Sequence, residues 1–599
     1  MTSKPTDQRI TRRAMLLTLG VVAALPLVEA CTPGAPAAKP AESKPADAKP
    51  AAPAAAAKPT EAPKPAAAQP AAAPATAVAA PAQATTVTKP TVQLLRPPEP
   101  NPKRGGTLRM AVGVTTSSFD IQQGGSQSVL CQMYSNLVQW NLGDGLRSIV
   151  PDLATSWEIA PDGKAYTFKL RDGVKFHDGT PFSAQDVVAT FNRIIKPPQG
   201  IVSVNQPLFS AVDKVEATDN TTVKFTLNKP QPLFLQLVAD PYQIIYSKKS
   251  LDENNQDLRK VIAPGTGPYK LKEHRPAEKW IFERNPDFYD KELPYVDTQE
   301  WIHAPAWSDR GTAVLTGQAD ISWNVSAETW DEGTTRKDQI GVNKLANFGA
   351  YAVFLNTKKK PLDDPRVRKA IHLAVSKQDI IKAFQTQEAV NLTRWAAHGG
   401  TYATPPEEIV KLPGYRQDKT QDIEAAKKLM AEAGVPDGFS IELLCASVAP
   451  HAEVMAPAFQ DQLKRTLKID AKIRVAERAL LIEEEKAGNF EMVLDTTGAI
   501  LPDISLTGGL YWKTGSPRNV GGYSNPKFDA LLAQYEVELD DSKRKQMVAD
   551  LQDILDDDPP WYLVGYTFHL PMWSTKLKGM AMDNRAFALW GRLETAWFA

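Results

Sequence analysis

Residues 154–193 constrain the fold of this chain more than any other stretch. Apolar and polar residues alternate on both sides of Pro161-Asp162-Gly163, as they do in half-buried strands, and this tripeptide favours a tight turn. The pattern therefore predicts a β-hairpin. Further along, Ser183 offers a hydroxyl to the open N–H groups of a helix whose apolar stripe includes Val187 and Phe191. We expect a small sheet followed by a helix here.

Composition narrows the possible functions. The chain has 599 residues with 69 basic and 69 acidic side chains, so its formal net charge is zero and no overall field attracts nucleic acid. Three cysteines in this length make no disulfide framework. The sequence contains no H-E-x-x-H, no G-x-S-x-G and no C-x-x-C, and its seven histidines are scattered. We therefore expect no catalytic residues, no metal ligands and no cofactor.

Residues 1–31 are predicted to be an export signal. Arg12 and Arg13 precede an apolar run that is shorter than the ~20 residues of a membrane-spanning helix. The paired arginines indicate the twin-arginine route. The segment that ends in Glu29-Ala30-Cys31 resembles a lipoprotein cleavage box, which implies a lipid on Cys31 that attaches the protein to a membrane. An uncleaved anchor and a soluble export signal are the alternatives.

Residues 32–103 differ in composition from everything that follows. They are mainly Ala, Pro and Lys in irregular repetition, with no apolar period. Such a segment cannot offset the entropy of ordering, so we expect a disordered tether with polyproline character. A low-complexity spacer without a selected length is the alternative.

A longer motif points to a family. From Trp157 to Phe182 the chain reads W-E-x-x-P-D-G-K-x-Y-T-F-x-L-R-x-G-V-K-F-H-D-G-x-P-F. This run resembles the signature of the family 5 solute-binding proteins, which are the extracytoplasmic receptors of ABC importers. Residues 264–269 and 361–370 match further motifs of the same family. The resemblance implies an α/β fold of the periplasmic-binding-protein type, type II or cluster C, with two large lobes, a hinge and an accessory lobe.

The resemblance also implies a division of the globular body. The first large lobe would comprise three stretches, and the hinge would cross near residues 351–356 and 564–569. The expected parts are 104–148, 263–350 and 567–599 for the first lobe, 149–262 for the accessory lobe, and 351–566 for the second lobe. Two local expectations accompany this division: a helix over 126–136, and a helix that begins at Pro365 with Asp364 as its cap.

Residues 495–503 resemble the cleft motif W-G-A-D-Y-x-D-P of the family. The Asp of that motif pairs with the amino terminus of the ligand in peptide-binding members, because a buried ammonium group needs a partner. Aligned on this chain, the motif's Trp falls on Thr497, next to Gly498, and its Asp falls on Ile500. The amine anchor is therefore missing from its usual place, and Asp503 is the candidate substitute.

Other cleft candidates come from loops and tryptophans. Thr116 and Ser117 follow the first predicted strand, where the loop lines the ligand cleft in the family; a solvated loop is the alternative. Trp395 and Trp512 lie in irregular stretches near matched cleft segments. Indoles stack on the apolar faces of sugar rings, so these two residues favour contact with an oligosaccharide solute. A place in the hydrophobic core is the other interpretation.

The expected function is that of a monomeric receptor on the outer side of the cytoplasmic membrane, in the periplasm or cell envelope. It would capture a peptide-like or oligosaccharide solute by hinge closure and deliver it unaltered to the permease subunits of an ABC importer. Nickel-type complexes are a third solute class. Two other functions stay open on the same scaffold: an enzyme with a nucleophile and a base in the cleft, and a sensor or adhesion module.

Overall fold

The computed structural model of the chain describes residues 95–97, 99–113, 116, 118–125, 127–141, 148–384, 390–398, 400–447, 451–498, 503–580 and 592–599. These residues lie in the second of two compact units, which spans residues 82–599. Their strands form three main sheets, each with its own hydrophobic core. No helix among them is long and apolar enough to cross a membrane.

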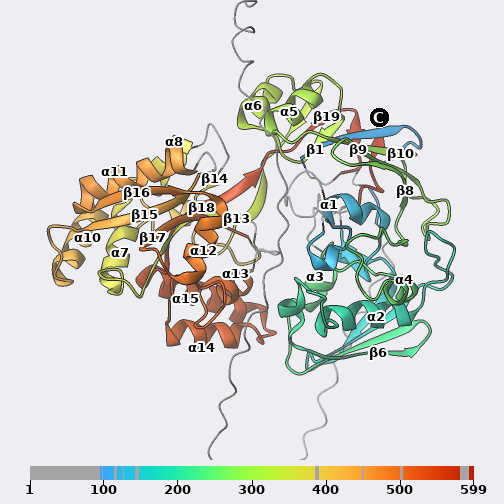
Figure 1. The fold of residues 1–599 in the computed structure, drawn as a ribbon, viewed down its shortest axis with the longest axis horizontal. Coiled ribbons are helices and arrows are strands. Elements are labelled where there is room, and N and C mark those ends of the chain that lie inside the picture. Colours follow the sequence, from blue (N-terminus) through green and yellow to red (C-terminus); the bar gives the residue numbers. More distant parts are fainter. Residues whose placement is uncertain are drawn as a thin grey trace, which may run out of the picture. The chain divides into compact units, whose positions relative to one another are not determined.

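The first large lobe is built on a seven-stranded sheet. Strand β1 is parallel to its neighbours β10 and β11, whereas β9 is antiparallel to both of its neighbours, β10 and β8. Helices α5 (Trp307–Leu315) and α6 (Ala327–Thr334) pack on each other beside this sheet (Figure 1). In sheet order the strands are β12 (Ile340–Val342), β19 (Met572–Ser574), β11 (Ile321–Ser322), β1 (Thr107–Val112), β10 (Thr298–His303), β9 (Lys279–Arg284) and β8 (Tyr269–Arg275).

Both ends of the described chain are fastened to this first lobe. Arg96 forms an ion pair with Asp290 at 2.6 Å, and the backbone N–H of Gly105 donates to Tyr295 at 2.9 Å. At the other end, β21 (Trp597–Phe598) pairs with β20 (Leu577–Lys578). The ring of Phe598 lies beside Gly106, close enough that a Cβ there would meet it at 3.5 Å.

The accessory lobe contains the predicted hairpin and helix. Strands β4 (Ala154–Ile159) and β5 (Ala165–Leu170) are antiparallel, and Gly163 in the turn between them has a φ of 67°, which glycine adopts without strain. Helix α2 (Ala184–Ile195) begins with a capping box in which Ser183 and Asp186 satisfy each other's backbone N–H groups. The sequence prediction is confirmed here. The sheet is completed by β7 (Thr222–Leu227) and β6 (Val212–Asp219) in the order β4-β5-β7-β6.

The core of this lobe extends from Leu137 to Ile245, whereas Tyr246, Leu251 and Leu258 pack in the core of the first lobe. The core of the accessory lobe therefore begins and ends at lower residue numbers than the expected lobe, 149–262. The predicted helix over 126–136 is also shorter than expected. The structure has a four-residue α1 (Gln127–Leu130), followed by a 3-10 turn over Cys131–Met133. The remaining elements of this region are η1 (Ile121–Gln123), β2 (Val138–Trp140), β3 (Ile149–Pro151), η4 (Gln206–Phe209), α3 (Phe234–Val238) and α4 (Lys248–Glu253).

The second large lobe is built on a six-stranded sheet. Strand β13 (Leu345–Leu355) lies between β18 (Trp561–His569) and β17 (Met492–Thr497), antiparallel to both. Strand β15 (Ser440–Ala446) is parallel to β17 and to β16 (Asp470–Ala476), and β14 (Val390–Asn391) pairs with β18 at the other edge. The sheet order is β14-β18-β13-β17-β15-β16.

Helices pack against this sheet and against one another (Figure 1). Helix α7 begins at Pro365 with Asp364 as its N-cap, as the sequence predicted. The helices of the second lobe are α7 (Pro365–Ala374), α8 (Lys377–Phe384), α9 (Pro406–Ile409), α10 (Thr420–Glu432), α11 (Ala456–Leu467), α12 (Arg478–Ala487), α13 (Ile504–Tyr511), α14 (Pro526–Tyr535) and α15 (Asp541–Asp557).

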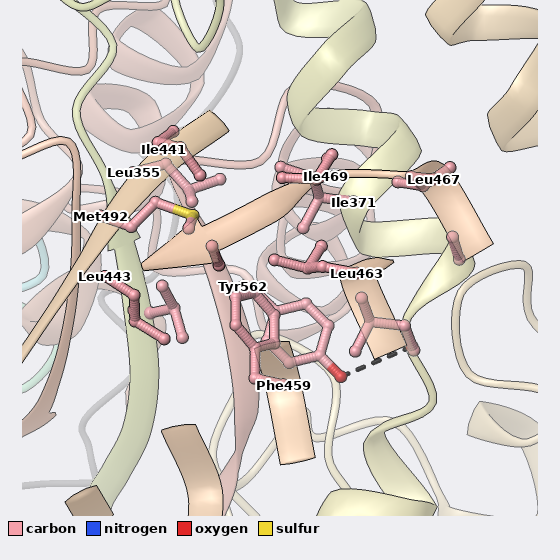
Figure 2. Close-up of a cluster of buried hydrophobic side chains, with 14 of the residues drawn as sticks. Leu355, Ile371, Ile441, Leu443, Phe459, Leu463, Leu467, Ile469, Met492 and Tyr562 are labelled. Carbon is pink, nitrogen blue, oxygen red and sulfur yellow. Dashed lines mark hydrogen bonds between the residues drawn. The ribbon is translucent and has the colours of Figure 1, made fainter. Parts of the chain in front are cut away.

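The core between the sheet and helices α7, α10 and α11 holds the second lobe together. Figure 2 shows Tyr562 of β18 among aliphatic side chains from these elements, with its hydroxyl donating to the carbonyl of Val375 at 3.4 Å. The ring of Phe459 packs on Tyr562 with centroids 4.9 Å apart. Burying each such side chain contributes about 1.5–3 kcal/mol. This lobe therefore has a large core of its own.

The chain passes between the two large sheets at two places. It leaves the first sheet at β12 and enters the second at β13, with residues 343 and 344 between them. It returns between β18 and β19, over residues 570 and 571. These crossings lie outside the expected 351–356 and 564–569. The reason is that β13 and β18 continue as paired strands almost to the edge of the first lobe.

A β-bulge interrupts that pairing close to the crossings. Ala346 pairs with Phe568 and Ala350 with Tyr566, so residues 347–349 face Thr567 alone. The hydroxyl of Thr567 accepts a hydrogen bond from Asn347 at 2.8 Å and donates to the carbonyl of Gly349 at 3.2 Å. This bulge is the most irregular part of the strand pair that connects the lobes.

Candidate functional site

The loop after β17 begins at an open position. Thr497 is buried and pairs with Ala350, whereas Gly498 is exposed, and a Cβ on Gly498 would meet no atom within 4 Å. The N–H of Gly498 donates to the hydroxyl of Tyr511 at 3.3 Å, and Arg518 donates to the same hydroxyl at 3.1 Å. The end of β17 is therefore joined to α13 while it leaves space beside Gly498.

Asp503 ends this loop as the N-cap of α13, and its carboxylate is fully engaged. One oxygen accepts hydrogen bonds from the N–H and the hydroxyl of Ser505, at 2.9 and 2.6 Å. The other oxygen accepts from the hydroxyl of Tyr535 at 2.7 Å and from Arg544 at 3.3 Å. Burial raises the pKa of Tyr535, so this hydroxyl keeps the proton that it donates. Asp503 has little capacity left for a ligand amine.

The accessory lobe meets the second lobe along a surface that we call the seam. Leu506 of α13 packs against the accessory-lobe core. Leu539 lies next to Gly163 of the accessory lobe, because a Cβ on Gly163 would be 3.3 Å from the side chain of Leu539. An ion pair crosses the seam, with Nζ of Lys229 lying 3.1 Å from Oε2 of Glu536. Apolar and charged contacts therefore both join the two lobes here.

Two cavities open in the seam. The first, which we call the lysine cavity, has a volume of about 270 Å³ and contains Lys229 and Lys513. Both lysines face Glu536, and Nζ of Lys513 lies 4.0 Å from Oε1 of that carboxylate. The rest of its lining is largely apolar and includes Leu208, Leu233, Leu237, Leu506 and Leu510.

The second cavity, which we call the aspartate cavity, has a volume of about 250 Å³. It is lined by the carboxylates of Asp503 and Asp541, together with the guanidinium group of Arg544. The hydroxyl of Tyr402 donates to Asp541 at 2.6 Å. Partial burial and this hydrogen bond raise the pKa of Tyr402, so its hydroxyl stays protonated.

The two cavities are neighbours, because Pro232, Leu233 and Arg544 line both of them. Arg544 is held in place by Asp503 and by the ring of Tyr535, which lies 4.0 Å below the guanidinium carbon. Both cavities combine side chains of the accessory lobe with side chains of the second lobe. A solute that filled them would contact both lobes at once.

Neither of the two candidate tryptophans lines a cavity of the seam. Trp395 and Trp512 both have 0% of their surface exposed, and their rings pack edge to face at 5.4 Å. The indole N–H of Trp395 donates to Asp556 at 2.7 Å, and Trp512 also packs on Trp561. A ligand can reach neither indole in this structure. Trp395 and Trp512 are therefore core residues in this structure and not the expected ligand contacts. Other aromatic side chains cover the irregular backbone around them.

The other sequence candidates are only partly described. Thr116 forms a local turn in which it accepts a hydrogen bond from the N–H of Ser118 at 3.3 Å, and it lines neither seam cavity. Ser117, Ile500 and the lipidation candidate Cys31 lie outside the described residues.

The residues that shape the seam could not be found from sequence motifs. Lys229, Tyr402, Lys513 and Asp541 come from turns and helix ends that carry no motif. The only local signal was the turn chemistry around Lys229, which precedes Pro230 and marks the end of a strand. Across the described ranges, no group of three or more His, Cys, Asp or Glu side chains is arranged to hold a metal ion.

Comparison with known proteins identifies similar chains. The family model described as "Bacterial extracellular solute-binding proteins, family 5 Middle" matches residues 148–517. The glutathione-binding protein GsiB of Pectobacterium atrosepticum is 28% identical over an alignment of 497 residues, and the alignment covers 78% of this chain and 90% of that protein. The dipeptide-binding protein DppE of Bacillus subtilis is 26% identical over 478 residues, covering 74% of this chain and 86% of that protein.

A solved structure is similar as well. The ABC transporter-associated periplasmic binding protein DppA of Helicobacter pylori, in complex with the peptide STSA, superposes with a TM-score of 0.67 at 27% identity. The superposition covers 83% of this chain and 98% of that chain.

Proposed function

We propose a solute class and a mode of capture from one premise, which is that this chain belongs to the bacterial extracellular solute-binding proteins, family 5. Its fold is the two-lobed α/β fold of the type II periplasmic binding proteins. It is an extracytoplasmic solute-binding receptor of an ABC importer and not an enzyme.

The proposed solute is a short peptide or a peptide-like compound such as glutathione. The observation that carries this proposal is the seam, where cavities of about 270 and 250 Å³ combine apolar side chains with charges of both signs. Ligand pockets commonly measure roughly 300–1,000 Å³, so the solute is small. The relatives named above bind glutathione and dipeptides, which supports the same class.

An oligosaccharide has less support. Its expected stacking partners, Trp395 and Trp512, are fully buried against each other. Sugar rings need exposed aromatic faces, and neither cavity of the seam is lined by a tryptophan.

Capture follows from contacts with two lobes. A solute that touches the accessory lobe and the second lobe together stabilises the closed arrangement by its differential affinity for that state. The closed receptor then delivers the solute to the permease without breaking a bond. We further propose that the receptor acts as a monomer, and that a lipid on Cys31 holds it at the membrane.

The proposal is tested with the full chain in detergent. We expect a pool of di- to tetrapeptides, or glutathione, to raise the melting temperature and to reduce the radius of gyration in solution scattering. A pool of maltooligosaccharides is the comparison. Stabilisation by the sugars and not by the peptides would overturn the assignment of the solute class.

Lipidation is tested separately in cells. Metabolic labelling with a fatty acid should tag the wild-type chain and leave the Cys31→Ser variant unlabelled. Equal labelling of the two chains, or none in either, would overturn the proposed anchor.

A further inference from the structure

A third cavity lies in the first large lobe, outside the seam, and we call it the basic cavity. Its volume is about 970 Å³, which exceeds that of either seam cavity. It opens between the start of β1, the end of α5, the start of β12 and the turn that follows β19, and Phe598 of β21 also lines it. All of these elements belong to the first lobe, so the capture of a solute in the seam does not use this cavity.

Cations outnumber carboxylates in the lining of the basic cavity. Arg109 is neutralised, because its guanidinium group forms an ion pair with Asp320 at 2.9 Å. Three further cations and one further carboxylate line the cavity, and no ion pair involves any of these four residues within the described ranges. The cations are Lys103, Arg104 and Lys576, and the carboxylate is Asp338. The lining therefore has an excess of positive charge.

Arg104 is held in place by neutral groups. One terminal nitrogen donates to the carbonyl of Lys291 at 2.8 Å and the other to the carbonyl of Pro294 at 3.5 Å. Its guanidinium carbon also lies 5.9 Å from the centre of the ring of Tyr295. None of these contacts cancels its charge. A guanidinium group has five N–H donors in a planar fork that matches a phosphate, so Arg104 keeps donors for such a group.

We propose that the basic cavity binds the phosphate-bearing headgroup of an anionic phospholipid. The phosphate lies against Arg104 and the ammonium groups of Lys103 and Lys576. The hydroxyl of Thr107 and the amide of Gln339 line the same cavity and add neutral donors. This inference rests on the proposed anchoring of the chain through Cys31 and adds a second contact with the same membrane.

The three cations act together on one anion. A cavity lined by charges of one sign concentrates their field, so an anion between Lys103, Arg104 and Lys576 is stabilised by all three at once. Charge-assisted hydrogen bonds to a phosphate are also stronger than neutral ones. Because all three side chains are exposed, salt screens the attraction, and binding should weaken as the ionic strength rises.

The position of the cavity in the chain favours a lipid over a free anion. Lys103 is the last residue of the tether that we expect over residues 32–103, and Arg104 is the next. The chain that leads to the proposed lipid on Cys31 therefore enters the folded body at the wall of the basic cavity. A tether makes a second contact with the same membrane effectively intramolecular, so a weak affinity for one headgroup is sufficient.

The apolar part of the lining suits the glycerol portion of a lipid. Leu315 and Phe598 are partly exposed where they line the cavity. Gly317 lies beside them on the turn after α5, and a Cβ there would meet no atom within 4 Å. The glycerol portion of a phospholipid can pack on this surface, whereas inorganic phosphate is too small to use it.

The experiment measures binding of the full chain to vesicles of phosphatidylcholine, with and without the anionic lipid phosphatidylglycerol. Every chain carries Cys31→Ser, so a lipid on this residue makes no contribution. The apolar run over residues 14–30 and the lysines of the tether are the same in all chains compared. Co-sedimentation should show tighter binding to the vesicles with phosphatidylglycerol, and the difference should shrink as salt is added.

A double variant tests the cavity itself. Lys103→Gln/Lys576→Gln should weaken binding to the phosphatidylglycerol vesicles by about five-fold for each cation removed. Lys196→Gln/Lys260→Gln is the matched control, because it removes two exposed lysines that lie outside the cavity and have no ion pair in the described part of the chain. The control should bind as the wild type does. Equal binding by the double variant and the control would show that the basic cavity is not the membrane contact.

Glycerol phosphate distinguishes a lipid from a soluble phosphate ester. It should compete with the vesicles only weakly, because it lacks the rest of the lipid surface. If it binds the wild type as tightly as the vesicles do, and the double variant does not bind it, the lipid assignment is wrong and the cavity is a site for a soluble ester. The tests of peptide binding and of labelling at Cys31 use other variants and readouts, so failure of this inference is distinguishable from failure of the proposed function.

Discussion

Lys229 and Glu536 are 307 residues apart in the chain, and their side chains form an ion pair at 3.1 Å that joins the accessory lobe to the second lobe. Both side chains are partly exposed, so the pair is screened and contributes on the order of 0.2–1 kcal/mol. Its importance lies in its position, because it can form only when the two lobes are in contact.

Loss of this ion pair should favour the open receptor. We expect Lys229→Gln to increase the radius of gyration of the solute-free chain in solution scattering, because it removes an ion pair that joins the accessory lobe to the second lobe. Lys214→Gln is a matched control, since Lys214 pairs with Glu216 on the same strand. The same scattering curve for Lys229→Gln and the control would contradict this prediction.

The buried carboxyl of Asp240 should make stability depend on pH. Burial raises the pKa of Asp240 from 3.8 to about 8, and one of its oxygens has no hydrogen-bond partner among the described residues. The folded chain therefore holds a proton that the unfolded chain releases near pH 4. Stability is retained at low pH and falls as the pH rises from about 4 to about 8, by at most about 1.4 kcal/mol per pH unit.

Asp240→Asn removes the titrating group and should flatten this part of the pH profile in chemical denaturation. Asp213→Asn, at an exposed position of β6, should leave the slope as it is in the wild type. An unchanged slope in Asp240→Asn would show that this carboxyl does not titrate in the expected range.

The two buried tryptophans should respond differently to the same change. Trp395→Phe removes the hydrogen bond to Asp556, whereas the indole N–H of Trp512 has no partner among the described residues. We expect Trp395→Phe to be the more destabilising by roughly 1–3 kcal/mol, because it leaves a buried acceptor with one bond fewer. Neither change should alter solute affinity. Urea denaturation measures the stability of the two variants, and calorimetric titration measures their solute affinity. A loss of affinity without a loss of stability would show that the tryptophan contacts the solute.

The bulge near the lobe crossings should control how fast the receptor opens. Thr567→Val keeps the shape of the side chain but removes its hydrogen bonds to Asn347 and Gly349. We expect faster solute release in stopped-flow measurements and a stability cost of roughly 1–2 kcal/mol. Thr575→Val removes a comparable bond to Asp338 within the first lobe and should leave the release rate unchanged. Equal release rates in both variants would mean that the bulge is not a point of movement.

The local elements of this fold could be predicted from the sequence because their signals are local. Ser183 and Asp186 are three residues apart, and the capping box that they form needs no distant partner. The same holds for Asp364 and Pro365 at the start of α7, and for the turn around Gly163. The long family motif added the lobed fold, which these elements alone do not specify.

The site could be predicted only in part, because its partners meet through the fold. The motif led to Asp503, yet its engagement depends on Tyr535 and Arg544, which come from later helices. Asp541 and Lys513 carry no motif at all. Trp395 and Trp512 had the irregular surroundings of cleft residues, and only the packing of one indole on the other shows that they are buried.

The fastening of both ends of the described chain to the first lobe has a mechanical consequence. Arg96 and Gly105 bind Asp290 and Tyr295, and the strand that contains Phe598 closes over the same region. A pull on the residues that precede this point is carried by the first lobe alone. With the anchor that we propose at Cys31, the first lobe is the part held near the membrane, and closure moves the second lobe relative to it.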